Sequence, residues 1–168
     1  MSGEILVVRC GTIPYAEAWE KQRELAARRR REEIGDVLML LEHPPVYTRG
    51  RRSQPGELPM GAEWYEAQGI EVHDTDRGGL VTYHGPGQLV GYPIVALGEL
   101  DARDDVHEYV RGLERTMTGA LGKAGVRAST IEGLTGVWVG TRKIGSIGLH
   151  VSRGVTTHGL AINVNNDL

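Results

Sequence analysis

The sequence contains one cysteine, Cys10, and no phenylalanine, and it lacks any long apolar run. A single thiol excludes an intrachain disulfide and a zinc site built from several cysteines. The longest apolar stretches, such as Val37–Leu41, are far shorter than the roughly 18 residues that a membrane helix needs. The sequence therefore predicts neither a membrane-spanning protein nor one held together by disulfides.

Charge and histidine spacing argue against two further classes of function. The formal net charge is −3, from 19 Lys and Arg against 22 Asp and Glu, which disfavours broad nucleic-acid binding. The six histidines show no pair at the spacing of a His-Glu-x-x-His site, so we expect no metal and no other cofactor. Residues Met1–Glu4 lack the basic start of a secretory signal, and we expect a soluble, cytoplasmic protein.

Glycine is what the sequence has in excess. Its 24 glycines among 168 residues are about twice the usual share of roughly 7%. They follow no collagen or linker period, so we expect them in tight turns and where the backbone closely approaches a ligand. The length suits one globular domain, residues 1–168, and the sequence contains no internal repeat.

Hydrophobic spacing predicts two long helices among short strands. A strand over residues 4–9 precedes a helix that reaches about Arg31, and a second helix follows a cap at Asp101 or Asp104 and ends before Gly125. Short strands between glycine-rich turns fill residues 70–95 and 136–164. Since helices and strands do not alternate strictly, we predict an α+β fold in which a mixed, largely antiparallel sheet is flanked by helices.

The densest cluster of unusual residues is Arg77–Gln88, a short strand between two glycine turns. Gly78 and Gly79 can offer backbone N–H groups to a carbonyl or phosphate, and Arg77 can anchor an anion. The strand sends alternate side chains to opposite faces: Thr82 and His84 to one, Val81 and Tyr83 to the other. From the residues alone, a ligand site and a purely structural pair of turns with a packed His84 are equally good interpretations.

Five further motifs accompany this segment along the chain. They are Glu42-His43-Pro44-Pro45-Val46-Tyr47-Thr48 with Gly50-Arg51, Gly136-Val137-Trp138 through Arg142-Lys143-Ile144, Ile147-Gly148, His158-Gly159, and Asn163-Val164-Asn165. Together with Arg77-Gly78-Gly79, Thr82, His84–Gln88 and Tyr92, they resemble the signature of the lipoyl(octanoyl) transferase family. The resemblance runs from about residue 5 to the last residue, and it implies the fold of lipoate- and biotin-protein ligases.

The resemblance implies that an octanoyl group passes from acyl carrier protein to a lysine of a lipoyl domain, in a 2-oxoacid dehydrogenase or the glycine cleavage H protein. In the family a cysteine holds the acyl chain as a thioester, and a nearby lysine lowers the pKa of that thiol. Lys143 stands at the position of this catalytic lysine. The substrate-binding residues that the resemblance implies are Arg77, Gly78, Gly79, Leu80, Val81, Thr82, Tyr83, His84, Ser146, Ile147, Gly148, Gly159, Leu160 and Ala161.

Spacing alone gives a plainer interpretation of the later segments. Lys143 lies two residues past a hairpin turn, where lysines are commonly solvent-exposed, and a regular strand would point Lys143 and Ser146 to opposite faces. We therefore expect Ser146–Gly148 to contact substrate through backbone groups, with Gly148 permitting a close approach. Gly159–Ala161 suit an acyl tunnel or ordinary strand packing, and His158 suits either a carbonyl- or proton-orienting role or a structural one.

The family's cysteine lies a short way beyond the Asn163–Asn165 motif, in a Pro-Cys-Gly context that residues 1–168 do not contain. Cys10 matches no family motif, and we interpret it as a small apolar residue. We expect the natural protein to continue and to be an octanoyltransferase. Two alternatives remain: an ATP-dependent lipoate-protein ligase that holds an acyl-adenylate with Lys143, and a non-catalytic acyl- or carrier-binding protein. Arg51 and Arg52 are candidates for the basic surface that an acidic carrier protein would contact.

Overall fold

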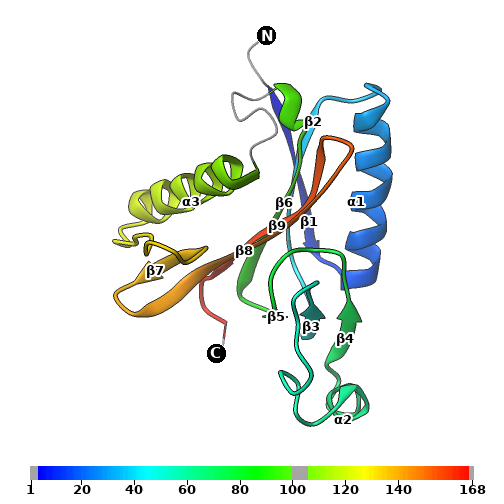
Figure 1. Ribbon diagram of the computed structural model, residues 1–168, viewed down its shortest axis with the longest axis vertical. Coiled ribbons are helices and arrows are strands. Elements are labelled where there is room, and N and C mark those ends of the chain that lie inside the picture. Colours follow the sequence, from blue (N-terminus) through cyan, green and yellow to red (C-terminus); the bar gives the residue numbers. More distant parts are fainter. Residues whose placement is uncertain (1–3, 100–105, 167–168) are drawn as a thin grey trace.

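The computed structural model describes residues 4–99 and 106–166, which form two sheets and three α-helices (Figure 1). The elements in chain order are β1 (Ile5–Thr12), α1 (Tyr15–Arg30), β2 (Asp36–Glu42), β3 (Val46–Arg49), α2 (Ala62–Ala67), β4 (Glu71–Asp74), β5 (Val81–His84), β6 (Gln88–Ile94), a 3-10 turn (Leu97–Glu99), α3 (Val106–Lys123), β7 (Val137–Val139), β8 (Arg142–Ser152) and β9 (Val155–Asn163). The expected caps Asp101 and Asp104 lie outside the described residues. Gly125, with φ of 82°, follows the end of α3 as predicted. No helix in this part of the chain has the length and apolar composition that a membrane crossing requires.

Six strands form the main sheet, in the order β1-β2-β6-β9-β8-β7. The first two strands are parallel because α1 connects them as a crossover helix. The other neighbouring pairs among these strands are antiparallel. The predicted α+β class, with a mixed and largely antiparallel sheet flanked by helices, is therefore confirmed.

The two long helices cover opposite faces of the main sheet (Figure 1). Alternation along β9 makes this possible, since successive side chains of a strand point to opposite faces. Ala161 packs into the core beneath α1, whereas Ile162 packs into the core that includes Met117 and Leu121 of α3. The main sheet is thus buried on both sides where these helices lie.

A smaller sheet, in the order β4-β3-β5, carries the glycine-rich segment. It begins because His43-Pro44-Pro45 stops β2, since proline cannot donate to a strand ladder. The loop between β4 and β5, residues 75–80, crosses to the main sheet, where the N–H of Gly78 donates to the Leu149 carbonyl oxygen at 2.8 Å. This loop brings Arg77 between the two sheets.

Candidate functional site

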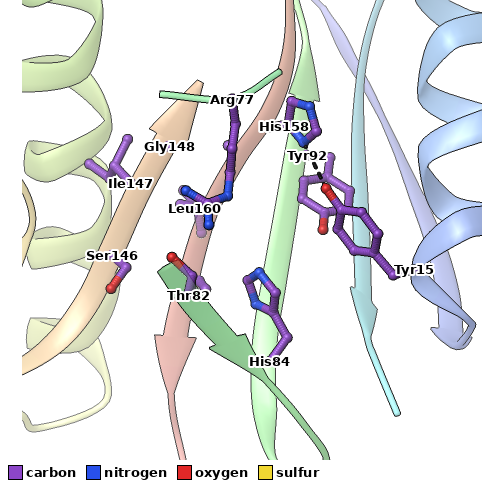
Figure 2. Close-up of a pocket in the computed structure, with 12 residues that line it drawn as sticks. Tyr15, Arg77, Thr82, His84, Tyr92, Ser146, Ile147, Gly148, His158 and Leu160 are labelled. Carbon is purple, nitrogen blue, oxygen red and sulfur yellow. Dashed lines mark hydrogen bonds between the residues drawn. The ribbon is translucent and has the colours of Figure 1, made fainter. Parts of the chain in front are cut away.

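A small inner cavity lies where the loop at residues 75–80 meets β8 and β9. Its lining joins all three segments that the sequence singled out: Arg77, Thr82 and His84, then Ser146, Ile147 and Gly148, then Gly159, Leu160 and Ala161. Tyr15, Tyr92 and His158 complete the wall (Figure 2). The volume is about 30 Å³, which holds one or two water molecules but no acyl chain.

A larger cleft of about 700 Å³ adjoins the inner cavity and shares four of its residues, Arg77, Thr82, Ser146 and Ile147. It lies within the usual range of ligand sites, about 300–1,000 Å³. Further predicted residues line it: Gly79, Leu80, Val81, Tyr83 and Lys143. Along β5, Val81 and Tyr83 line only this outer cleft and His84 lines only the inner cavity, as the expected alternation predicts, whereas Thr82 lines both hollows.

Arg77 is the charged group at the junction of the two hollows. Arg77 is 6% exposed, and its Nε and Nη2 both donate to Oγ1 of Thr48, at 3.1 and 2.7 Å. The remaining bonds go to the backbone oxygens of Thr48 and Gly78. Burial lowers the pKa of Arg77, but an arginine stays charged. Since all its bonded acceptors are neutral, the guanidinium is suited to attract negative charge into the cavity.

Glycines pack tightly around Arg77, which corrects two expectations. A Cβ on Gly148 would lie 2.9 Å from the Gly78 carbonyl oxygen and 3.2 Å from Cδ of Arg77. The close approach at Gly148 is therefore made by the protein's own loop, not by a substrate. The N–H of Gly78 is likewise bonded to Leu149, so it is not free to bind a ligand, and Gly78 lines neither hollow. Gly50 also contacts this loop closely, since a Cβ there would lie 2.7 Å from Nη1 of Arg77.

His84 is held as a neutral imidazole. Its Nδ1 is 2.6 Å from Oε1 of Gln88, whose amide nitrogen donates to the Tyr83 carbonyl and to Oδ1 of Asn163. Because that orientation makes Oε1 the acceptor, Nδ1 carries the proton and Nε2 carries the lone pair. Burial lowers the pKa of His84 to about 3. The ring therefore offers the cavity a hydrogen-bond acceptor, not a positive charge.

His158 anchors the loop that carries Arg77. Its Nε2 donates to Oδ1 of Asp76 at 2.7 Å, so its Nδ1 accepts from the Tyr15 hydroxyl at 3.3 Å (Figure 2). The backbone N–H donates to the Gln22 side chain, and φ is +57°, a strained value for a residue with a Cβ. Burial lowers the pKa of His158, while the bond to Asp76 raises it. With both ring nitrogens bonded inside the protein, the structural role is the better of the two interpretations.

Lys143 and Ser146 line the same cleft, so the expectation that they face opposite ways is wrong. The reason is a β-bulge: Val137 pairs with Gly145 and Trp138 pairs with Lys143, which leaves Ile144 as an extra residue. Nζ of Lys143 lies 5.1 Å from the centre of the Trp138 ring. Burial lowers the pKa of Lys143, and the charge of Glu114 raises it.

Cys10 lies far from this arrangement in the order of the sheet. It is on β1, at the opposite edge of the main sheet from β7, and it packs against the core beneath α1. Burial raises the pKa of its thiol, which leaves less thiolate at neutral pH. The apolar interpretation of Cys10 agrees with this position.

Sequence comparison identifies close relatives of the chain. A sequence model of the lipoyl protein ligase A/B catalytic domain matches residues 14–168. The octanoyltransferase of Solibacter usitatus is 52% identical over 158 residues, covering 94% of this chain and 71% of that protein. The octanoyltransferase of Gloeobacter violaceus is 48% identical over 167 residues, covering 99% of this chain and 72% of that protein.

Solved structures with the same fold include lipoate-protein ligases. A bipartite lipoate protein ligase from Thermoplasma acidophilum superposes with a TM-score of 0.74 at 20% identity, covering all of this chain and 64% of that one. Lipoate-protein ligase A bound with ATP gives a TM-score of 0.70 at 18% identity, covering 99% of this chain and 68% of that one. At this identity the structures establish the fold alone, whereas the relatives near 50% identity establish the family. The chain belongs to the octanoyltransferase family, within the lipoyl protein ligase A/B catalytic-domain family.

Proposed function

We propose that this protein transfers an octanoyl group from acyl carrier protein to a lysine of a lipoyl domain. One observation carries the proposal: three segments far apart in the sequence meet around adjoining hollows, and Lys143 lines the larger one. The identity of about 50% to octanoyltransferases supports the same activity.

In this proposal the acyl chain occupies the outer cleft. The inner cavity is too small for eight carbons, whereas the outer cleft offers apolar walls at Leu80, Val81 and Ile147. The thioester carbonyl lies at the junction, where the Arg77 guanidinium offsets the charge that develops on its oxygen. The remaining predicted substrate-binding residues line the two hollows. The outer cleft is lined by Gly79 and Tyr83, both hollows by Thr82 and Ser146, and the inner cavity by His84, Gly148, Gly159, Leu160 and Ala161. Gly78 contributes by tying the loop to β8.

The reaction takes two steps through the cysteine that the family resemblance implies. Its thiolate attacks the octanoyl thioester carbon, a new C–S bond forms, and the pantetheine thiolate of the carrier leaves and takes up a proton. The ε-amine of the acceptor lysine then attacks, a C–N bond forms, the cysteine thiolate leaves, and the amine releases a proton. The ammonium of Lys143 lowers the pKa of the cysteine, which raises its thiolate fraction.

The partners in this proposal are octanoyl-acyl carrier protein as donor and the lipoyl domains of 2-oxoacid dehydrogenases or glycine cleavage H protein as acceptors, in the cytoplasm. Arg52 lines the outer cleft, and both Arg52 and its neighbour Arg51 are exposed. These two cations are suited to steer an acidic carrier toward the cleft.

The test uses the natural protein, whose intact mass is measured first. Incubated with octanoyl-carrier and a lipoyl domain, it should add one octanoyl group to the domain without ATP. Transfer that requires ATP would support a ligase instead, and carrier binding without turnover would support a binding protein.

Lys143→Ala should reduce the rate of transfer at least about 100-fold, because an activated nucleophile loses its charge partner. The side chain is exposed enough that the melting temperature should hardly change. Unchanged transfer by a folded Lys143→Ala protein would remove the lysine from the mechanism.

A further inference from the structure

Glu114 is a buried carboxylate that the proposed reaction does not use. It is 1% exposed and lies on the side of α3 that carries the core residues Met117 and Leu121. Its Oε1 accepts the backbone N–H of Gly136 at 2.8 Å, and its Oε2 accepts from Nη1 of Arg111 at 2.6 Å. A carboxylate in a helix core is unfavourable unless it is bonded in this way, so its position calls for an explanation beyond packing.

Gly136 connects this carboxylate to Lys143. A Cβ on Gly136 would lie 2.5 Å from Cε of Lys143 and 3.2 Å from its Nζ, so the lysine side chain runs directly past the glycine. The backbone there has φ of +129°, a conformation that favours glycine. The Trp138 ring flanks the ammonium as well, with its centre 5.1 Å away. The lysine therefore lies in a slot between Gly136 and Trp138, and Glu114 fixes the Gly136 wall of that slot.

We propose that Glu114 is the positioning residue for Lys143: it fixes the Gly136 wall of the slot and places a negative charge behind that wall. The inference rests on the proposed function, in which the ammonium of Lys143 activates a thiol. Glu114 acts only through Lys143 and touches no substrate.

The charges around Lys143 support this role. Burial lowers the pKa of the lysine and Glu114 raises it. Because burial favours the neutral amine, the ammonium form depends on an anion that offsets this cost. Glu114 supplies that anion from α3, with Arg111 sharing one of its oxygens.

The test measures the titration of Lys143 directly. The protein is acylated with a trace amine reagent across the alkaline pH range, and the labelled peptide is quantified by mass spectrometry. Glu114→Gln keeps the shape and an oxygen for Gly136 but removes the charge. It should lower the pKa of Lys143, because the charge that favours the ammonium is gone. The alkaline limb of the transfer rate should move down by the same amount.

Two further variants fix the sign of the effect. Arg111→Gln, at a half-exposed position, leaves the Glu114 charge undivided and should raise the pKa of Lys143. Arg111→Gln also tests the proposal if the Glu114→Gln protein does not fold. Glu108→Gln removes the same charge from an exposed position on the same helix and should change neither readout.

The outcomes separate this inference from the proposed function. If Lys143→Ala abolishes transfer but Glu114→Gln and Arg111→Gln leave the Lys143 titration unmoved, the role of Glu114 is refuted. If Lys143→Ala leaves transfer intact, the lysine itself is not catalytic, whatever its pKa.

Discussion

Replacing Thr48 by valine tests whether Arg77 is held as described. Thr48 is fully buried, and its Oγ1 accepts two hydrogen bonds from the guanidinium, at 3.1 and 2.7 Å. Valine has nearly the same shape, so the substitution removes these bonds without opening a cavity. A hydrogen bond to a charged group contributes about 1.5–3 kcal/mol, and the two share one oxygen, so Thr48→Val should lower the free energy of unfolding by about 2–4 kcal/mol.

Urea unfolding of the purified protein measures this loss, with Thr48→Ser as the matched control. Serine keeps the hydroxyl and loses one buried methyl group, which costs about 1 kcal/mol. The valine variant should therefore be the less stable of the two, and its melting temperature should fall by roughly 5–15 °C for a domain of this size. If Thr48→Val proves as stable as Thr48→Ser, the bonds to Arg77 do not hold the loop, and the account of the site is wrong.

Two more predictions concern buried groups around the inner cavity. Because burial lowers the pKa of His84 from 6.5 to about 3, the unfolded chain binds this proton first as the pH falls. The free energy of unfolding should therefore decrease from about pH 6.5 toward pH 3, by up to about 5 kcal/mol, and His84→Gln should flatten that slope in urea titrations; an unchanged slope would contradict the burial effect. Gly148→Ala should destabilise the protein by about 1–3 kcal/mol, since its Cβ would meet the Gly78 carbonyl. Gly119→Ala, which meets nothing within 4 Å on α3, should instead stabilise it by about 0.5–1 kcal/mol, and equal effects of the two would refute the crowding at Gly148.

The local sequence pattern was sufficient to predict the parts of the site that lie on regular strands. The period of two along β5 correctly separates His84 from Val81 and Tyr83, because strand geometry alone decides it. The mixed character of the sheet also follows in part from the order of the elements. The parallel pair β1–β2 arises because α1 connects these strands, and the consecutive strands β7, β8 and β9 form antiparallel hairpins. The antiparallel pairs β2–β6 and β6–β9 join strands that are distant in the chain, and their pairing did not follow from local order.

The features of the site that the sequence did not predict depend on contacts between elements that are distant in the chain. The bulge at Ile144 depends on how β7 lies against β8, and its local signal in the sequence is the adjacent Gly145, since a glycine inside a strand often marks a bulge. Tyr15 reaches the cavity from α1 only after the fold has formed, and nothing near it in the sequence indicates that role. Glu114 did carry a signal: it continues the helical spacing of Val110 toward Met117, so a carboxylate stands in an otherwise apolar stripe.

The hydrogen bond between the Gly78 N–H and the Leu149 carbonyl oxygen allows local opening of the site to be measured by hydrogen exchange. An amide proton exchanges with solvent only when its hydrogen bond opens, and this one bridges the loop of the small sheet and a strand of the main sheet. Exchange at Gly78 therefore reports how often the loop at residues 75–80 detaches from β8. Amides within the β8–β9 ladder report the unfolding of the main sheet itself. Comparing the two exchange rates separates local opening of the site from unfolding of the main sheet.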